Sequence, residues 1–133
     1  MHKPKLIIAV HVVDHLIDPR KFLQELVSIS SPKVELFIIV HDEASLLRNI
    51  LKNRWAPFCL QHPQIFNIKS LTSLLKSVGF LKIDNCKTSN WISPKQAGIL
   101  LESISILPAG ISALLPNVGI PIKLGNFAVS AQK

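Results

Sequence analysis

The sequence predicts an α/β fold in which helices cover both faces of a sheet. Two continuous apolar runs rich in β-branched residues, LIIAVHVV and VELFIIV, are typical of strands buried on both faces. Segments with apolar residues at helical spacing lie between the predicted strands. The resulting order is strand, helix, strand, helix, helix, strand, helix, strand, an alternation that argues for an α/β sheet.

The first strand is predicted over residues 5–13, and a helix follows it. Asp18 suits the capping position of that helix because its carboxylate can accept a backbone N–H. Pro19 suits the first helical position, where no N–H is needed. The apolar stripe of this helix consists of Phe22, Leu23, Leu26 and Val27.

The second strand is predicted over residues 34–40, and a helix over residues 43–52 comes next. Asp42 is expected to cap this helix. The side chains expected to face inward are Leu46, Leu47, Ile50 and Leu51. A loop over residues 53–65 then leads to a helix that begins at Phe66–Asn67.

Gly79 is expected to end that helix, because glycine readily adopts the left-handed conformation found there. An alternating strand over residues 80–87, a helix over 94–107 and a last strand over 124–131 complete the predicted elements. Residues 103–122 are uncharged and long enough to cross a membrane. Their three prolines would break backbone hydrogen bonds in lipid, so a buried, broken cap is predicted instead.

Composition indicates one folded domain over residues 1–133. Hydrophobic residues make up 48% of the chain and charged residues 17%, which excludes a disordered protein. The net charge of +7 is spread along the chain, so no specific nucleic acid is expected as a partner. The mean hydropathy of +0.36 indicates surface that meets a membrane or another chain.

The two cysteines, Cys59 and Cys86, form no CxxC pair. This favours a reduced, cytoplasmic protein, although a single disulfide stays open. His11, Asp14 and His15 interrupt the first apolar run, so no signal peptide is predicted. No GxGxxG, GxxxxGK[ST], GxSxG or HExxH motif occurs.

Histidines and aspartates gather where the predicted strands end. In open α/β sheets, ligands bind beyond the carboxyl ends of the strands. His11, Asp14 and His15 follow the first strand there, and His41–Asp42 follows the second. If residues 11–15 form a helical turn, the three side chains share a face and could hold a divalent cation. Alternatively, His15 acts as a general base, or Asp14 is a cap and the histidines are structural.

Five further residues are candidates for ligand contact. Asp42 is expected to cap a helix first, with His41 at the rim of the site. His62 lies in the long loop, and loops often carry function. Trp55 and Phe58 either line a pocket or anchor the loop to the core.

Four segments resemble the Rossmann-like, S-adenosylmethionine-dependent methyltransferases. They are VHVVDHLIDPRKFLQEL, VELFIIVHDEASLL, NRWAPFCLQHPQIFNIKSLTSLLKSVGF and IPIKLGNFAVSAQK. These are similar to the family's fourth strand with its "EH" segment, its fifth strand, its "W…H…F…GF" block and its last strand. The resemblance covers almost the whole chain, and the order of the segments is specific.

The resemblance implies half of the family's sheet, strands 4-5-7-6 with strand 7 antiparallel, and flanking helices. The glycine-rich loop and the acidic ribose-binding residue that hold S-adenosylmethionine would lie before Met1. The first strand would then present an open edge, able to pair with a completing chain or a second copy. The chain alone is therefore expected to bind the cofactor poorly and to be inactive.

The resemblance also implies roles for individual residues. His15 and Asp14 are the expected catalytic residues, and His11 is expected to contact the cofactor. The expected acceptor-binding residues are His41, Asp42, Trp55 and His62. Some relatives hold magnesium on an ExxEH segment. The corresponding HxxDH set, His11, Asp14 and His15, is a weak metal candidate that would favour a softer ion.

The methyl acceptor, a small molecule or another substrate, is not identified. A non-catalytic interaction protein or a gene fragment, pairing through the open edge, is the competing hypothesis. Membrane association through residues 103–122 is not expected.

Overall fold

The computed structural model describes residues 3–123 and 125–133, and it divides into two compact units. The larger unit runs up to Thr88 and resumes at Gly125, and the smaller unit lies between them. The predicted start of the last strand, Leu124, lies outside the described residues.

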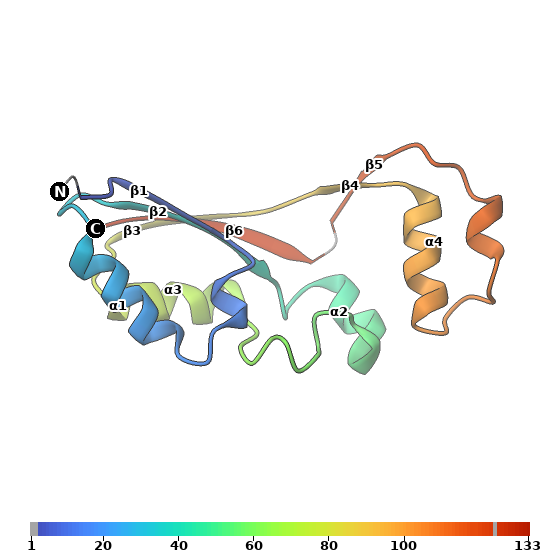
Figure 1. Cartoon of the computed structure of the whole chain (residues 1–133), viewed down its shortest axis with the longest axis horizontal. Helices are drawn as coiled ribbons and strands as arrows, with labels where there is room; N and C mark the ends of the chain where they lie inside the picture. Colours follow the sequence, from blue (N-terminus) through green and yellow to red (C-terminus); the bar gives the residue numbers. More distant parts are fainter. Residues whose placement is uncertain (1–2, 124) are drawn as a thin grey trace. The chain divides into compact units, whose positions relative to one another are not determined.

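A four-stranded sheet forms the centre of the larger unit (Figure 1). Its strands are β1 (Leu6–Val10), β2 (Glu35–His41), β3 (Lys82–Lys87) and β6 (Asn126–Gln132). Their order is β1-β2-β6-β3, with β1 and β2 parallel and β6 antiparallel to both of its neighbours. The expected strand order, with the last strand inserted antiparallel between the second and third, is confirmed.

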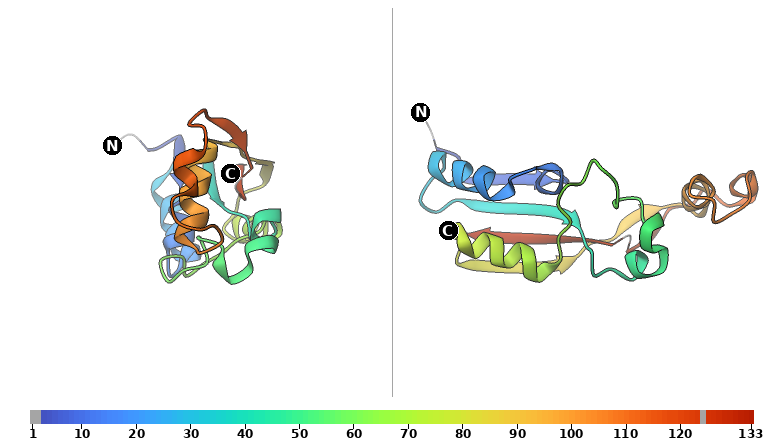
Figure 2. Two further views of the ribbon diagram at one scale, coloured as in Figure 1. Left: turned by 90° about the vertical axis from the view of Figure 1, so that its right-hand side faces the viewer. Right: turned by 90° about the horizontal axis from the view of Figure 1, so that it is seen from below.

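Two helices, α1 (Pro19–Ile29) and α3 (Ile68–Ser77), lie on one face of this sheet (Figures 1 and 2). The predicted cap of α1 is confirmed, since the Asp18 carboxylate accepts the Lys21 N–H at 2.9 Å. Asn67 caps α3 by accepting the Ser70 N–H, and Ser70 returns the bond to the Asn67 backbone. These reciprocal bonds satisfy N–H groups that the first turn of a helix leaves unpaired.

The core lies between the helices and the covered face of the sheet. Its members point to one side of the strands because successive strand residues alternate between faces. The fully buried ones include Leu23, Leu36, Ile38, Val40, Leu71, Leu75, Phe127 and Val129. Phe80, which is 2% exposed, fills the space after Gly79, whose φ of 101° ends α3 as predicted.

The prediction that helices cover both faces is wrong for the described part of the larger unit. On the face opposite α1 and α3, Leu6, Ile8 and Val10 are 57%, 62% and 49% exposed. The apolar runs are continuous because both faces of β1 and β2 are apolar, yet α1 and α3 both pack on one of them. The predicted alternation of residues 80–87 also fails, since β3 is almost entirely exposed.

The helix after β2 differs from its prediction. α2 covers only Leu46–Leu51, and Ser45 caps it by accepting the Arg48 N–H at 3.1 Å. Asp42 instead accepts the Ala44 N–H at 2.9 Å in the turn before it. Leu46 and Ile50 are 75% and 65% exposed rather than inward, and no residue of α2 is buried.

The smaller unit contains β4 (Asn90–Ile92), β5 (Ile120–Ile122) and α4 (Pro94–Ser103). β4 and β5 pair antiparallel, a hairpin-like contact that sequence patterning missed. Residues 103–122 are not a buried cap, since Leu114 and Val118 are 86% and 70% exposed. No helix within residues 3–123 and 125–133 has the length and apolarity needed to cross a membrane.

Candidate functional site

The candidate site lies where β1 and β2 end and β6 begins. The backbone N–H of His11 donates to the carbonyl of Ile39 at 2.9 Å, so the chain leaves β1 beside the end of β2. His41, the last residue of β2, pairs with Asn126, the first residue of β6. Three chain segments therefore meet at the carboxyl edge of the parallel pair, where α/β sheets bind ligands.

A tight turn brings Asp14 back toward this edge. His11 has a φ of 50°, a left-handed conformation that turns the chain sharply off the strand. A 3₁₀ turn, η1 (Val13–His15), follows and buries Val13 and Asp14 almost completely. The predicted common face of residues 11, 14 and 15 does not form, because His11 lies before the turn and His15 is exposed.

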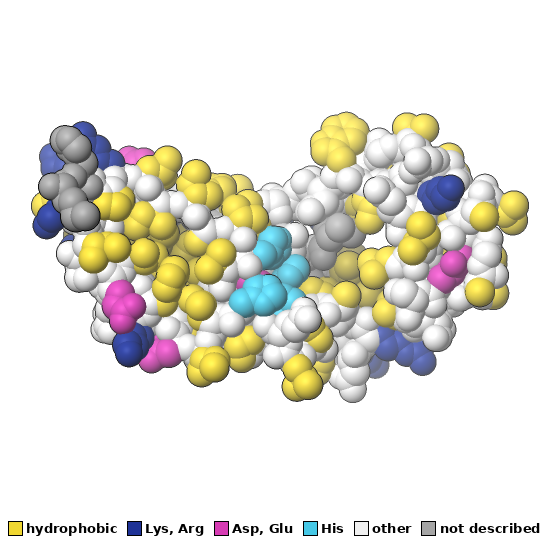
Figure 3. Space-filling view, viewed as in Figure 1, with side chains coloured by type: hydrophobic (Ala, Val, Ile, Leu, Met, Phe, Trp, Pro, Cys, Tyr) yellow, Lys and Arg dark blue, Asp and Glu magenta, His cyan; other side chains and the backbone are white. Residues whose placement is uncertain are grey.

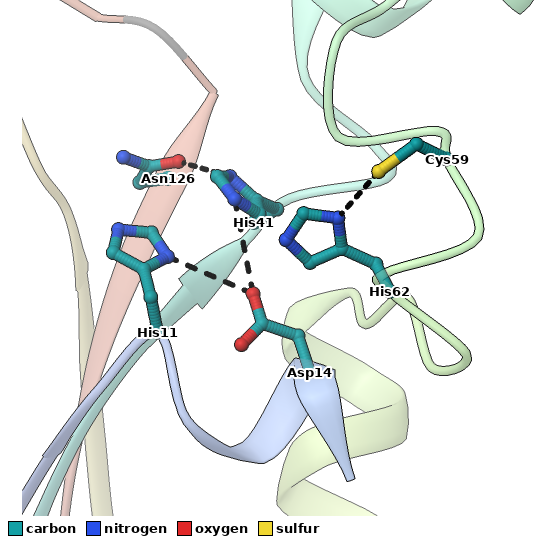
Figure 4. Close-up of polar contacts among 6 residues, drawn as sticks. All are labelled: His11, Asp14, His41, Cys59, His62 and Asn126. Atoms are coloured by element: carbon teal, nitrogen blue, oxygen red, sulfur yellow. Dashed lines mark hydrogen bonds and ion pairs between the residues drawn. The ribbon is translucent and has the colours of Figure 1, made fainter. Parts of the chain in front are cut away.

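Four histidines and one aspartate gather at this point, and we call them the histidine cluster. Its members are His11, Asp14, His15, His41 and His62. Figure 3 shows histidines grouped beside hydrophobic side chains, and Figure 4 shows how most of the cluster lies. The sequence-based prediction that these residues lie together is confirmed by their contacts.

Within the cluster, Asp14 faces two imidazoles. Its Oδ2 lies 3.6 Å from His11 Nδ1 and 3.8 Å from His41 Nε2. The His11 and His41 rings are 4.5 Å apart between centroids. Both oxygens of Asp14, which is 1% exposed, lack a hydrogen-bond partner among the described residues, and so does His11 Nδ1.

The remaining two histidines form the outer part of the cluster. The rings of His15 and His62 lie 4.3 Å apart, and His62 stands edge-on to His41 at 5.0 Å. The loop that carries His62 is held to the η1 turn by a bond from the Gln64 N–H to the Asp14 carbonyl at 3.4 Å. Sequence reasoning missed Cys59, whose Sγ lies 3.2 Å from His62 Nδ1, although its i, i+3 spacing pointed to it.

His41 is held from behind by two residues. Its Nδ1 lies 2.8 Å from Asn126 Oδ1, an oxygen that only accepts, so Nδ1 carries the proton. In the neutral ring this leaves the Nε2 lone pair facing Asp14. Trp55 meets the ring edge-on at 5.9 Å and is 2% exposed, which favours the anchoring alternative for this residue. Asn126 was not anticipated, although it stands in the quoted LGN segment.

Burial lowers the pKa of two histidines of the cluster. Loss of water around His41 lowers its pKa, and the hydrogen bond that its Nδ1 donates to Asn126 only partly opposes this effect. The pKa of His62 is lowered as well, first by desolvation and then by repulsion from His15.

Two residues on the predicted list are not members of the histidine cluster. Asp42 is 3% exposed, and its backbone N–H donates to the Gly125 carbonyl at 2.7 Å. Trp55 lies behind His41, as described above.

A hollow of about 330 Å³ lies beside His62, within the size range of small-molecule sites. Its lining residues are Phe58, Cys59, Leu60, His62 and Ile65.

Known proteins share this arrangement of elements. The chain aligns over its full length with an S-adenosylmethionine-dependent methyltransferase of Thermotoga maritima, described as a possible histamine N-methyltransferase, at a TM-score of 0.61 and 16% identity. A second S-adenosylmethionine-dependent methyltransferase, from Archaeoglobus fulgidus, aligns with 99% of this chain at a TM-score of 0.59 and 17% identity. The chain spans 58% and 61% of the lengths of these two proteins.

A third structure, a Haemonchus contortus phosphoethanolamine N-methyltransferase in complex with S-adenosyl-L-methionine, matches with a TM-score of 0.54 and 12% identity; all of this chain aligns with 34% of that one. At such identities the matches show a common fold. No curated protein matches the sequence. A family model described as a methyltransferase domain matches residues 2–84, more than half of the chain. This protein therefore belongs to the methyltransferase domain family.

Proposed function

We propose that this chain forms the acceptor side of an S-adenosylmethionine-dependent methyltransferase that acts on a small molecule. The observation that carries the proposal is the histidine cluster at the carboxyl edge of β1 and β2, beside a hollow of about 330 Å³. Solved relatives of the same fold include complexes with S-adenosyl-L-methionine and with phosphomonomethylethanolamine, a small acceptor.

The exposed histidines are the residues proposed to touch the acceptor. S-adenosylmethionine, when bound, supplies an activated methyl group on a positively charged sulfur. His15, exposed and next to the hollow through His62, would take the proton that an acceptor hydroxyl or amine gives up. His62 would contact the acceptor, His41 and Asp42 would form the rim, and His11 would face the cofactor.

Most of the rate enhancement is expected from placement rather than from covalent chemistry. Holding two reactants in line converts a bimolecular step into an effectively unimolecular one. The bonds that fix His41 to Asn126 and the His62 loop to the η1 turn supply a rigid wall for that purpose. Buried Asp14 lies close to both His11 and His41.

The residues of this chain provide only part of a binding site for S-adenosylmethionine. No glycine-rich loop occurs in the sequence, and β1 is followed by the His11 turn rather than by such a loop. We infer that another segment or chain, placed beside β1, provides most of the S-adenosylmethionine pocket. Calorimetric titration of the 133-residue chain with S-adenosylmethionine should give no saturable heat; micromolar binding would contradict this division of labour.

Methyl transfer itself is tested by adding a separate segment that binds the cofactor. A segment carrying the glycine-rich loop of a structural relative is supplied in trans, and labelled methyl transfer to small amines and alcohols is measured. We expect transfer only in the mixture, reduced roughly 10²- to 10⁴-fold by His15→Gln, the range typical of a lost general base. No transfer by a mixture that has folded and bound cofactor would reject the function. Full activity of the His15→Gln variant would reject the role of His15.

One observation favours a second function, self-association through β1. Among the described strands β1 pairs only with β2, so its outer edge carries free backbone groups, and three of its apolar side chains are exposed. Such an edge is a template for pairing with another chain. Light scattering at high concentration should show a dimer that Ile8→Lys abolishes, whereas a clean monomer would count against this function.

A further inference from the structure

The three inner members of the histidine cluster have the composition and spacing of a metal site. One nitrogen each from His11 and His41 and one carboxylate oxygen of Asp14 lie within 4.8 Å of one another. The residues come from the end of β1, the η1 turn and the end of β2, so the fold itself brings them together. His41 replaces His15 in the set that the sequence suggested.

The distances within this set are too long for hydrogen bonds. His11 Nδ1 and His41 Nε2 lie 3.6 and 3.8 Å from Asp14 Oδ2. Hydrogen bonds between such atoms span about 2.7–3.2 Å. Two ligand atoms each about 2.0–2.2 Å from one tetrahedral ion are roughly 3.3–3.6 Å apart. The observed spacing is close to that of atoms that share a cation.

The burial of Asp14 also requires a positive partner. A carboxylate without hydrogen bonds in a buried position is costly, and both of its oxygens lack partners within the described part of the chain. Among the described residues, the basic side chains that approach its carboxylate are His11 and His41, at 3.6 and 3.8 Å. Because Asn126 holds the proton on His41 Nδ1, the other nitrogen of a neutral His41 points a lone pair at the carboxylate. A cation between them would convert this repulsion into attraction.

We propose that His11, Asp14 and His41 bind one divalent transition-metal ion of the zinc type. Two imidazoles and one carboxylate suit zinc, cobalt or nickel, whereas magnesium and calcium prefer sets made of oxygen. Asn126 plays the supporting part that hydrogen-bonded partners commonly play behind a metal-binding histidine. Three protein ligands leave a position open, as in catalytic zinc sites.

A bound ion would also have a role in the proposed methyl transfer, and this catalytic role rests on the proposed function. The open position would face the edge assigned to the acceptor and would lower the pKa of an acceptor hydroxyl bound there. Metal binding itself needs neither cofactor nor acceptor. The two proposals can therefore fail separately, because metal binding and methyl transfer are measured in independent experiments.

The test titrates the untagged 133-residue chain, freed of metal by a chelator, with Co²⁺, Zn²⁺ and Mg²⁺. We expect one Co²⁺ per chain with visible absorption bands, displacement by Zn²⁺, and no binding of Mg²⁺. His11→Gln and His41→Gln should weaken binding by at least roughly tenfold, the lower end of the loss caused by disturbing a metal's outer partners. The matched controls His62→Gln and Cys59→Ser should bind as the unaltered chain does.

A second measurement keeps the test independent of how the variants fold. In the unaltered chain, paramagnetic Co²⁺ should broaden the amide signals around the η1 turn and the end of β2 and leave those of the smaller unit sharp. No binding of Co²⁺ or Zn²⁺, broadening elsewhere, or binding that depends on Cys59 and His62 but not on His11 and His41 would overturn the proposal.

Discussion

The two compact units of this protein differ in how each is stabilised internally. The larger unit has a continuous apolar core of helix and sheet residues, fourteen of them buried. In the described part of the smaller unit no apolar side chain is fully buried, and the buried residues are Ser93, Gly98 and Ser112. The comparison teaches that 48% hydrophobic residues do not by themselves make a core. Apolar side chains must also be placed where another element can cover them.

Leu71→Ala should have the largest effect, because it empties a fully buried position under the sheet. A cavity of this kind costs about 2–5 kcal/mol of unfolding free energy. Chemical denaturation of the larger unit measures it. The control is Ile8→Ala on the bare face, where the side chain is 62% exposed and the loss should be much smaller. Equal losses would mean that the bare face is covered in solution.

Gly98→Val should disrupt the smaller unit while sparing the larger one. A Cβ at Gly98 would lie 2.8 Å from Leu115 Cδ1 and 3.2 Å from Ser112 Cα, so α4 could no longer approach η3 (Ile111–Leu114). Overpacking of this kind costs about 1–3 kcal/mol. Hydrogen exchange should speed up at amides 94–115 and remain unchanged in β2 and β6. Uniform acceleration would show that the two units unfold together.

The helix caps offer a matched pair, one in each unit. Ser93 caps α4 and Asn67 caps α3, each through a reciprocal bond with the residue three positions on. Replacing such a residue by Ala costs about 1 kcal/mol. Ser93→Ala should therefore fray the first turn of α4 in the smaller unit, and faster hydrogen exchange of its amides should show this. Asn67→Ala, backed by the core, should only lower the melting temperature of the larger unit.

Acid should weaken one contact of the smaller unit and give the smallest effect. The Glu102 carboxylate accepts the Ser112 backbone N–H at 2.6 Å, and this bond lowers the pKa of Glu102. A lowered pKa in the folded state stabilises that state above the ordinary pKa of glutamate, and the benefit is lost as the pH falls through the lowered value. The Ser112 amide shift should follow this titration, and Glu102→Gln should remove it.

Much of the fold follows from local sequence signals. The apolar runs determine β1 and β2, Asp18–Pro19 marks the start of α1, and Asn67 and Gly79 mark the two ends of α3, because strand propensity and helix caps act through neighbouring residues. The segment order and its family resemblance anticipated β6 between β2 and β3. The pairing of β4 with β5 and the exposure of Leu46 and Ile50 were missed, because short elements leave little periodic pattern.

The sequence by itself determined that histidines and an aspartate would gather at the carboxyl edge of two parallel strands, since parallel strands end on the same side. Only the tertiary structure decided which of them meet. The left-handed turn at His11 and the hydrogen bond from His41 to Asn126 orient His11 and His41 toward Asp14, while His15 turns to His62. Those contacts depend on backbone conformation and on residues more than eighty positions apart, which sequence spacing does not encode.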